Sequence, residues 1–350
     1  MKAAIIGTGV MGQVLAFNLL QAGWQVTLFD QRASADALNC SQTAAGLLTP
    51  MSELEKNAAI IFQLGVISLK KCWPTLLQQL PEPVYFADKG SLVLAHPNDK
   101  AELQRFQHHI ETRLELMPNS THVQQSVIRQ LEPELAQFQE GLYLSAEGNL
   151  DNQQFLTILQ QFLLDRSVKF CYNETVIPTA DWGKTQGFQW VFDCRGLGAQ
   201  QDLPGLRGIR GEVIWLHAPE VNVQRPIRLM HPRHSIYIAP RPNHLYIVGA
   251  SEIETEDNSP ISVQSTLELL SAAYYLHKGF AEARVLKTLT HSRPTFEDHL
   301  PKIFYRPGLI ALNGLYRHGF LLAPVLAQEI LRYLTQDFSS LHFPNLWQTF

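Results

Sequence analysis

The chain has 350 residues, of which 45% are apolar and 17% charged, and its formal net charge is −4. This composition is typical of a globular enzyme with a large buried core, and the length predicts two domains. The weakly acidic balance argues against a nucleic-acid partner, and without an apolar run of about 18 residues or a signal peptide we expect a cytoplasmic protein with no membrane partner.

The first 30 residues predict a β-α-β unit. Residues 2–6 form a short apolar strand, residues 13–21 carry apolar side chains at helical spacing, and residues 25–30 form a second strand. Gly23 suits the left-handed conformation that ends many helices. The unit has the length and element order of a nucleotide-binding fold.

The loop between the first strand and the helix has the spacing GxGxxG. Gly7 permits the tight turn, Gly9 lets the backbone approach a pyrophosphate, and Gly12 lets the helix pack closely on the strand. The helix N-terminus attracts phosphates, and Asp30 at the end of the second strand can accept hydrogen bonds from ribose hydroxyls. The context predicts a dinucleotide site, although these residues do not distinguish NAD from FAD.

The rest of the chain mixes helical and strand patterns. We expect helices over residues 52–80, 99–116, 152–164, 262–279 and 323–334, and strands over 168–177, 189–194 and 308–313. Residues 84–95 predict a hairpin around Asp88-Lys89-Gly90. Residues 208–251 alternate apolar and polar and predict an antiparallel meander.

Elements of βα type stand at the start, middle and end of the chain, with antiparallel material between them. The pattern predicts an α/β fold in which a Rossmann-like domain is interrupted by an antiparallel-sheet domain of α+β type. We assign residues 1–80, 145–207 and 290–350 to the nucleotide-binding domain. Residues 81–144 and 208–289 would form the second domain, which holds the substrate.

Two later segments favour FAD over NAD. Residues 191–198 are a strand that enters a Gly-x-Gly turn, which could also be an ordinary strand end. Residues 313–324 are a strand, a glycine loop and a helix with Pro324 near its first turn. A helix N-terminus aimed at a flavin stabilises the negative charge of its reduced form.

The four cysteines show no spacing typical of a metal site. Cys40, Cys72, Cys171 and Cys194 form no CxxC pair and have no histidine cluster beside them. We therefore expect free thiols and no metal.

Taken together, these motifs resemble the D-amino-acid oxidase superfamily of flavoproteins, and within it the ThiO-type glycine oxidases of thiamine synthesis. The matching stretches follow the family's order and span nearly the whole chain. They are residues 7–12 with Asp30, 43–50, 192–199, 205–216, 236–254, 292–303 and 314–324.

The resemblance implies that FAD lies extended along the Rossmann-like domain, with the second domain over the flavin face. This chain has Asp30 where the family usually has Glu, and Leu315 and His318 where His and Asn are frequent. Besides the three glycines and Asp30, the residues implied to contact FAD are Val10, Met11, Gln31, Cys40, Ser41, Ala45, Gly46, Leu47, Val176, Gly196, Leu315, Tyr316, Arg317, His318, Gly319, Phe320 and Leu321.

A small amino acid is recognised mainly through its carboxylate, and the planar guanidinium of an arginine can bind both oxygens. The resemblance implies this role for Arg293, supported by the hydroxyl of Tyr237, and places Arg317 in the flavin loop. From the residues alone, Arg293 could instead cap a strand before Pro294, and Tyr237 could be an ordinary sheet residue.

The implied reaction is oxidation of glycine or another small amino acid, with hydride transfer from Cα to flavin N5 and reduction of O2 to H2O2, for thiamine thiazole synthesis. Water can take the amine proton, so no side-chain base is required. Members of the family tend to form homo-oligomers. Two alternatives are an oxidase of N-methyl or aminomethyl groups, of the sarcosine-oxidase or tRNA-modification type, and a non-catalytic dinucleotide-binding protein.

Overall fold

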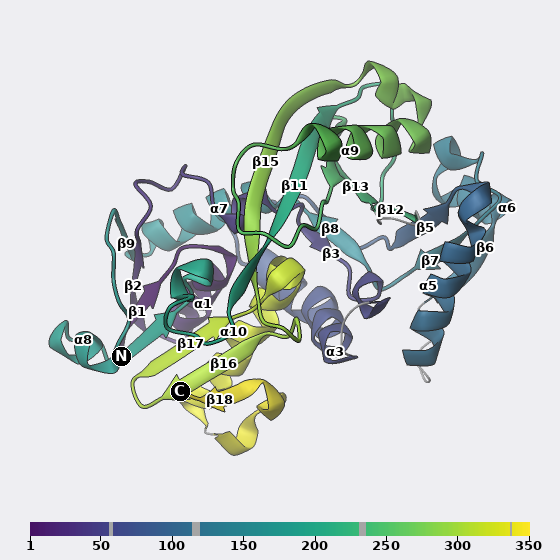
Figure 1. The fold of residues 1–350 in the computed structure, drawn as a ribbon. Helices are drawn as coiled ribbons and strands as arrows, with labels where there is room; N and C mark the ends of the chain where they lie inside the picture. Colours follow the sequence, from purple (N-terminus) through teal and green to yellow (C-terminus); the bar gives the residue numbers. More distant parts are fainter. Residues whose placement is uncertain (56–58, 114–119, 231–235, 337) are drawn as a thin grey trace.

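The computed structural model describes residues 1–350 except 56–58, 114–119, 231–235 and 337. Its described strands form sheets of seven, eight and three strands (Figure 1). The larger two occupy different parts of the molecule, and the long strands β11 and β15 of the eight-stranded sheet extend toward the seven-stranded one. This arrangement confirms the predicted α/β fold class with a second, largely antiparallel sheet.

The seven-stranded sheet contains the predicted nucleotide-binding unit. In spatial order its strands are β18 (Trp347–Thr349), β16 (Lys302–Arg306), β17 (Leu309–Asn313), β10 (Trp190–Asp193), β1 (Lys2–Ile6), β2 (Gln25–Asp30) and β9 (Lys169–Tyr172). The five from β17 to β9 are parallel. Strand β9 ends five residues before its predicted end, because Asn173 adopts the left-handed conformation, with φ of 59°, and turns the chain.

Both faces of this parallel sheet are covered, as its continuous apolar strands require. Ala3 and Ile5 face a core built with α1 (Val10–Gln21), α7 (Asn152–Asp165) and α10 (Gly319–Thr335). Ala4 and Ile6, which alternate with them, face a smaller cluster that includes residues of α8 (Ala180–Thr185).

The eight-stranded sheet forms most of the second unit. Its strands, in spatial order, are β15 (Arg284–Thr295), β11 (Arg207–His217), β14 (Leu245–Gly249), β13 (Ile236–Arg241), β12 (Ile227–Met230), β5 (Ser91–Ala95), β7 (Glu140–Leu144) and β6 (Ser120–Gln124). Helix α9 (Val263–Leu276), capped by the Ser262 side chain, packs against β11, β13 and β14. Ile214 and Leu216 share the core that α9 enters, whereas Val213 and Trp215 belong to a separate cluster.

The predicted hairpin over residues 84–95 is wrong. Strand β4 (Phe86–Ala87) pairs with β8 (Gly148–Leu150) in the three-stranded sheet, which is completed by β3 (Leu47–Leu48), whereas β5 pairs with β7 and β12. Gly90, with φ of 77°, makes the corner between the two sheets. The pattern located both strands but assigned them to one another because they are adjacent in sequence.

The predicted meander over residues 208–251 is also wrong in order. Strand β11 lies next to β14, whereas β12, β13 and β14 follow one another; residues 231–235 lie outside the described part. The other neighbour of β11 is β15, a 12-residue strand that the sequence pattern did not indicate. Residues 284–288 are all exposed. This part of β15 has no buried face, and its sequence therefore does not show the alternation of apolar and polar residues typical of a half-buried strand. Strand β15 crosses the predicted domain boundary at residue 290, and the domain limits remain a prediction.

The long helix expected over residues 52–80 is broken into several pieces and ends before Pro81. A 3₁₀ turn over Ser52–Glu55 is followed by α3 (Ala59–Ile67), a π-helical segment over Ser68–Cys72 and α4 (Trp73–Leu77). Pro74 has no N–H to donate to residue 70, and the helix widens just before it.

The run Ala59–Leu77 passes a test of length and apolarity for a membrane-crossing helix, but half of the tested window is buried inside the molecule. Leu69, Cys72 and Trp73 belong to the largest core cluster. This packing is what a core helix of a globular protein shows.

The last helix begins earlier than expected, at Gly319 instead of residue 323. Pro324 therefore lies inside α10 and cannot donate to the carbonyl of Phe320. That carbonyl accepts a hydrogen bond from Trp73 Nε1 at 3.0 Å instead. The remaining described helices are α2 (Cys40–Thr43), α5 (Lys100–Arg113) and α6 (Gln125–Leu131).

A buried carboxylate joins three segments near the three-stranded sheet. Glu147 is fully buried and accepts hydrogen bonds from the backbone N–H of Ser52 at 2.5 Å, from Ser52 Oγ at 3.0 Å and from Ser91 Oγ. Burial raises its pKa from 4.5 to about 7, although these hydrogen bonds and the charge of Arg228 oppose the shift. The protonated form is therefore favoured in the folded state.

This pKa shift predicts that the free energy of unfolding depends on pH. Between pH 4.5 and about 7 the folded chain holds a proton on Glu147 that the unfolded chain has released, so stability falls as pH rises, by about 3 kcal/mol in total. We expect Glu147→Gln to raise Tm relative to wild type at pH 8 but much less at pH 4.5. Thermal unfolding across this pH range measures the difference. Glu140→Gln, at an ion-paired carboxylate with a lowered pKa, is the control and should give no such gain. An equal Tm difference at both pH values for Glu147→Gln would contradict the shift.

Candidate functional site

The glycine loop brings β1, α1 and β10 into close contact. Gly7 has φ of 107°, and a Cβ there would lie 2.4 Å from the carbonyl oxygen of Cys194. A Cβ on Gly12 would lie 1.9 Å from the carbonyl oxygen of Gly7. Both distances are far below van der Waals contact, so the turn requires glycine at these positions. Helix α1 starts after Gly9 with no side chain capping it, and the N–H of Val10 donates to Ser41 Oγ at 2.9 Å.

Asp30 is buried at the end of β2 and is held by two neighbours. Its carboxylate accepts hydrogen bonds from Thr8 Oγ1 at 2.6 Å, from the Thr8 N–H at 2.9 Å, and from the N–H and guanidinium of Arg32. Burial alone would raise the pKa of Asp30, but the hydrogen bonds from Arg32 and Thr8 outweigh it and lower the pKa. Arg32 and Thr8 were not identified from the sequence, and the ribose contact of Asp30 remains a prediction.

A cavity of about 780 Å³ opens between the eight-stranded sheet, the segment of residues 40–49 and the starts of α1 and α10. Most of the predicted site residues line it. They are Val10, Cys40, Ser41, Ala45, Gly46, Leu47, Tyr237, Arg293, Tyr316, Arg317, His318, Gly319, Phe320 and Leu321. Segments that are far apart in the sequence thus line the same cavity.

The other predicted residues do not line this cavity. They are Gly7, Gly9, Met11, Gly12, Asp30, Gln31, Val176, Gly196 and Leu315. Val176 packs instead against the cluster on the α8 side of the parallel sheet. Gly196 accepts a hydrogen bond from Asn313 Nδ2 at 2.9 Å, which ties the two predicted flavin segments together. A smaller polar cleft of about 170 Å³, lined partly by Thr8, Arg32 and Gln42, lies beside Asp30.

The segment of residues 41–47 is held in place by hydrogen bonds from α7 and β13. Asn152, at the start of α7, donates to the carbonyl of Ser41 at 3.0 Å, and Arg241 donates to the carbonyl of Ala45. Gly46 has φ of 61°, and a Cβ there would lie 2.2 Å from the carbonyl oxygen of Leu150. Arg241 was missed in the sequence. Burial lowers its pKa to about 10, and no carboxylate of the described residues forms an ion pair with it.

The N-termini of two helices meet at the cavity. Helix α10 follows a tight loop in which Gly314 and Tyr316 both have positive φ, and His318 is almost fully buried there. A Cβ on Gly319 would lie only 3.6 Å from Val10 Cγ1, so the first turns of α10 and α1 are in contact. Neither helix has a side-chain cap. Two uncapped N-termini beside a long cavity fit a dinucleotide with a pyrophosphate and a ring that becomes negative on reduction.

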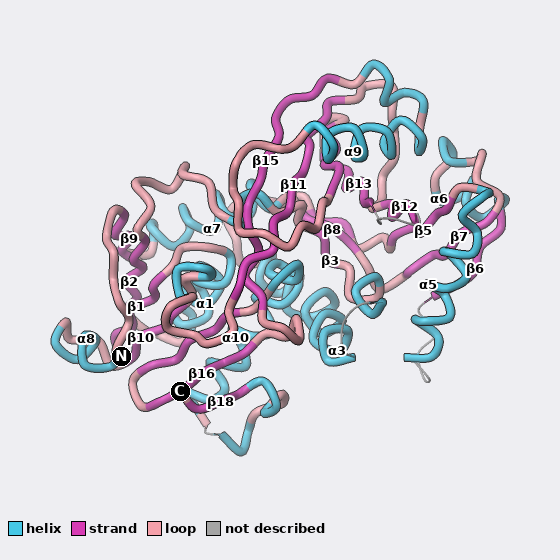
Figure 2. The backbone as a smooth tube through the Cα atoms, in the orientation of Figure 1, coloured by secondary structure: helices cyan, strands magenta, loops and turns pink. Residues whose placement is uncertain are grey.

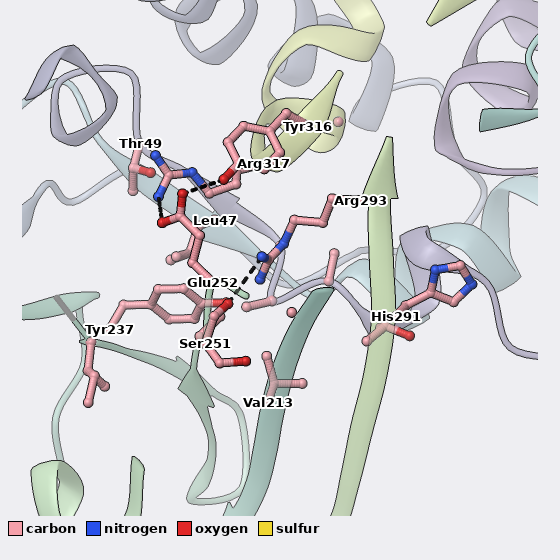
Figure 3. Close-up of a pocket in the computed structure, with 18 of the residues that line it drawn as sticks. Leu47, Thr49, Val213, Tyr237, Ser251, Glu252, His291, Arg293, Tyr316 and Arg317 are labelled. Atoms are coloured by element: carbon pink, nitrogen blue, oxygen red, sulfur yellow. Dashed lines mark hydrogen bonds and ion pairs between the residues drawn. The ribbon is translucent and has the colours of Figure 1, made fainter. Parts of the chain in front are cut away.

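Two arginines face the centre of the cavity (Figure 3). Arg293, on β15, donates from Nη1 to the carbonyl of Ser251 at 3.2 Å. Arg317 forms an ion pair with Glu252, Nη1 to Oε2, at 3.4 Å. Tyr237 extends from β13 toward the same space. The predicted substrate residues therefore lie together, and Glu252 joins them without having been identified in the sequence.

Gly211 makes room for Arg293. A Cβ on Gly211 would lie 2.0 Å from Nη2 and 2.1 Å from Cζ of Arg293, so the guanidinium lies directly over the backbone of β11. Gly249 stands in a similar relation to Tyr237, with a built Cβ 3.0 Å from its hydroxyl oxygen. A glycine inside a strand often marks such a close approach, and this signal was available in the sequence.

Two further titratable groups, Cys40 and His291, line the cavity. Burial raises the pKa of the Cys40 thiol to about 11 despite the opposing charge of Arg293. Burial also lowers the pKa of His291, whose ring points away from the labelled arginines in Figure 3. At neutral pH both are uncharged. All four cysteines are free thiols.

Comparison with known proteins agrees with this geometry. The chain is 37% identical, over 96% of its length and 97% of the relative, to a protein of Rhizobium etli named as a thiamine biosynthesis oxidoreductase, ThiO. It is 23% identical to the glycine oxidase of Geobacillus kaustophilus, over 92% of this chain and 89% of that protein.

The fold is shared with solved structures. The crystal structure of glycine oxidase from Geobacillus kaustophilus matches with a TM-score of 0.83 at 22% identity, over 99% of this chain and 97% of that one. Iminodiacetate oxidase from Chelativorans sp. BNC1 matches with a TM-score of 0.81 at 20% identity, over 99% of both chains.

A family model described as FAD dependent oxidoreductase, DAO, matches residues 2–333. This match confirms the resemblance found in the sequence. The chain belongs to the DAO family of FAD-dependent oxidoreductases, and its cofactor is FAD.

Proposed function

We propose that the protein is an oxidase of glycine or another small amino acid that serves thiamine thiazole synthesis. The observation that carries the proposal is Arg293, whose guanidinium faces the cavity and, among the described residues, donates a hydrogen bond only to the carbonyl of Ser251. The names of the relatives from Rhizobium etli and Geobacillus kaustophilus support the same substrate class. Membership of an oxidoreductase family speaks against the alternative of a non-catalytic nucleotide-binding protein.

The residues that would hold FAD lie on both large structural units. The N-terminus of α1 and Ser41 suit the pyrophosphate, while the loop of residues 45–47 and the start of α10 suit the ring. FAD held there would supply the acceptor for the hydride of the substrate Cα, and in the proposed reaction its two electrons together with two protons would convert O2 to H2O2. The protein supplies position and electrostatic stabilisation.

Arg293 and Tyr237 would bind the substrate carboxylate and so fix the direction of its Cα. A guanidinium that binds both oxygens of a carboxylate restricts rotation as well as distance. Cys40 and His291 are uncharged at neutral pH, so neither competes with Arg293 for the carboxylate. The apolar side chains of Leu47 and Val213 line the same cavity and limit the water in it. The amine proton can pass to water.

A substrate panel tests the proposal. Purified yellow protein is supplied with glycine, sarcosine, D-alanine and D-proline, and peroxide is followed. We expect peroxide from glycine or sarcosine. Absence of peroxide with all four, despite bound FAD, would reject a small-amino-acid oxidase and favour a larger amine substrate or an acceptor other than O2.

The glycine loop gives the first variant. In Gly9→Val, the added Cβ would lie 3.1 Å from Ser41 Oγ, and the larger branches would occupy the space before the N-terminus of α1. We expect folded protein without flavin, measured as loss of the visible absorbance with retained circular dichroism. A normal flavin spectrum would remove this loop from the pyrophosphate site.

The second variant, Arg293→Ala, removes the arginine that would bind the substrate carboxylate. Loss of a charge-assisted pair costs about 2–4 kcal/mol, so Arg293→Ala should raise the KM for the substrate on the order of 30- to 1000-fold while FAD stays bound. Steady-state peroxide assays measure it. Arg306→Ala, at an exposed arginine on β16, is the matched control. Unchanged kinetics in Arg293→Ala would exclude this residue from the site.

Gly211→Ala tests whether the glycine positions Arg293. The added methyl collides with the far end of a flexible side chain, so Arg293 moves and the backbone stays. We expect a Tm close to wild type, bound FAD, and a KM that approaches the value of Arg293→Ala. In the double variant the two effects should not add. Full additivity would show that Gly211 acts independently of Arg293.

A further inference from the structure

Residues 251 and 252 lie between the two cavity arginines. They follow β14 in the loop of residues 250–262, which passes beside β11 and β15 (Figure 2). The carbonyl of Ser251 accepts a hydrogen bond from Arg293 at 3.2 Å. The Glu252 carboxylate accepts one from Tyr316 Oη at 2.5 Å and forms the ion pair with Arg317. Each arginine is therefore held by a different type of group.

The type of partner decides how much of each arginine's positive charge is offset by a neighbouring negative charge. Glu252 places a formal negative charge beside Arg317, whereas Ser251 offers Arg293 only a carbonyl dipole. The Glu252 side chain is about a third exposed, at 32%, and lines the cavity, so a ligand in the cavity meets its charge. The charged side chains labelled in Figure 3 are thus the guanidinium groups of Arg293 and Arg317 and the Glu252 carboxylate.

We propose that Glu252 is a specificity-determining residue that restricts the site to ligands with one carboxylate. Arg293 binds that carboxylate, and Glu252 offsets the charge of Arg317, so that a second carboxylate gains no cation there. The inference rests on the proposed function, because it assumes that Arg293 receives the substrate carboxylate. It adds the substrate class: a small amino acid whose substituents on the nitrogen and on Cα carry no second carboxylate.

Glu252→Gln isolates the charge. The amide oxygen of glutamine can still accept the hydrogen bond from Tyr316, so the loop contact is kept. The amide nitrogen then faces Arg317 and cannot accept from it. Arg317 loses its carboxylate and becomes a second cation for a ligand that carries two carboxylates.

Sarcosine and iminodiacetate form a matched pair for the test. Both contain an N-substituted glycine unit, and iminodiacetate differs by a carboxylate on the N-methyl carbon. We expect the ratio of kcat/KM for iminodiacetate to that for sarcosine to rise at least tenfold in Glu252→Gln. Arg317→Met, which leaves Glu252 in place, should lower the same ratio, and the double variant should lose the gain.

Direct binding gives a readout that does not need turnover. Titration of the FAD-loaded protein with acetate and with malonate, followed by flavin absorbance, yields a Kd for each. The preference for malonate over acetate should also rise at least tenfold in Glu252→Gln. Glu282→Gln, which removes an exposed carboxylate beside Arg284 that does not line the cavity, should leave this preference unchanged.

The outcomes separate the two proposals. If the wild type oxidises none of the small amines, the proposed function fails, while the acetate and malonate titrations still report on Glu252. If the wild type oxidises glycine or sarcosine and neither ratio changes in Glu252→Gln, the charge role of Glu252 is wrong. A raised KM for sarcosine without any gain for iminodiacetate would also overturn it, because Glu252 would then be binding the substrate amine.

Discussion

Strands β11 and β15 run antiparallel over eleven residue pairs, from Arg207 opposite Thr295 to His217 opposite Arg284. This ladder determines the site, because it sets which residues of the two strands share a face. Gly211 is opposite His291, and Ile209 is opposite Arg293. A slip of one residue would turn Arg293 to the other face of the sheet and place another residue under its guanidinium. The position of Arg293 in the cavity therefore requires the correct register of β11 and β15.

A second constraint is the contact between the first turns of α1 and α10. The two helices come from opposite ends of the chain and meet because their strands, β1 and β17, lie on either side of β10 in the parallel sheet. Gly319 allows the approach to Val10. In an open parallel sheet the carboxyl ends of the strands are the usual place for a ligand. The cavity lies there, so the positive ends of both helix dipoles act on the same bound group.

The sequence could predict the parts of the fold that depend on local pattern. The glycine loop, Asp30 and the strands of the parallel sheet follow from spacing within about 30 residues. Strand pairings that join distant segments could not be predicted in this way. Strand β15 has no apolar alternation, and β4 and β5 look like a hairpin although their partners lie elsewhere. Glu252 lies in the matching stretch of residues 236–254, but its role was not predicted, because its partners Tyr316 and Arg317 are more than 60 residues away.

The distribution of charge along the cavity connects these features. Arg32 is paired with Asp30 near the glycine loop, outside the large cavity, and Arg317 is paired with Glu252 inside it. Arg293 and the buried Arg241 donate to carbonyl oxygens, and the described residues place no carboxylate in an ion pair with either. These two guanidinium groups therefore place positive charge beside the cavity, Arg241 from behind the loop of residues 45–47. A substrate carboxylate and the negative charge of a reduced flavin would both be stabilised by that charge.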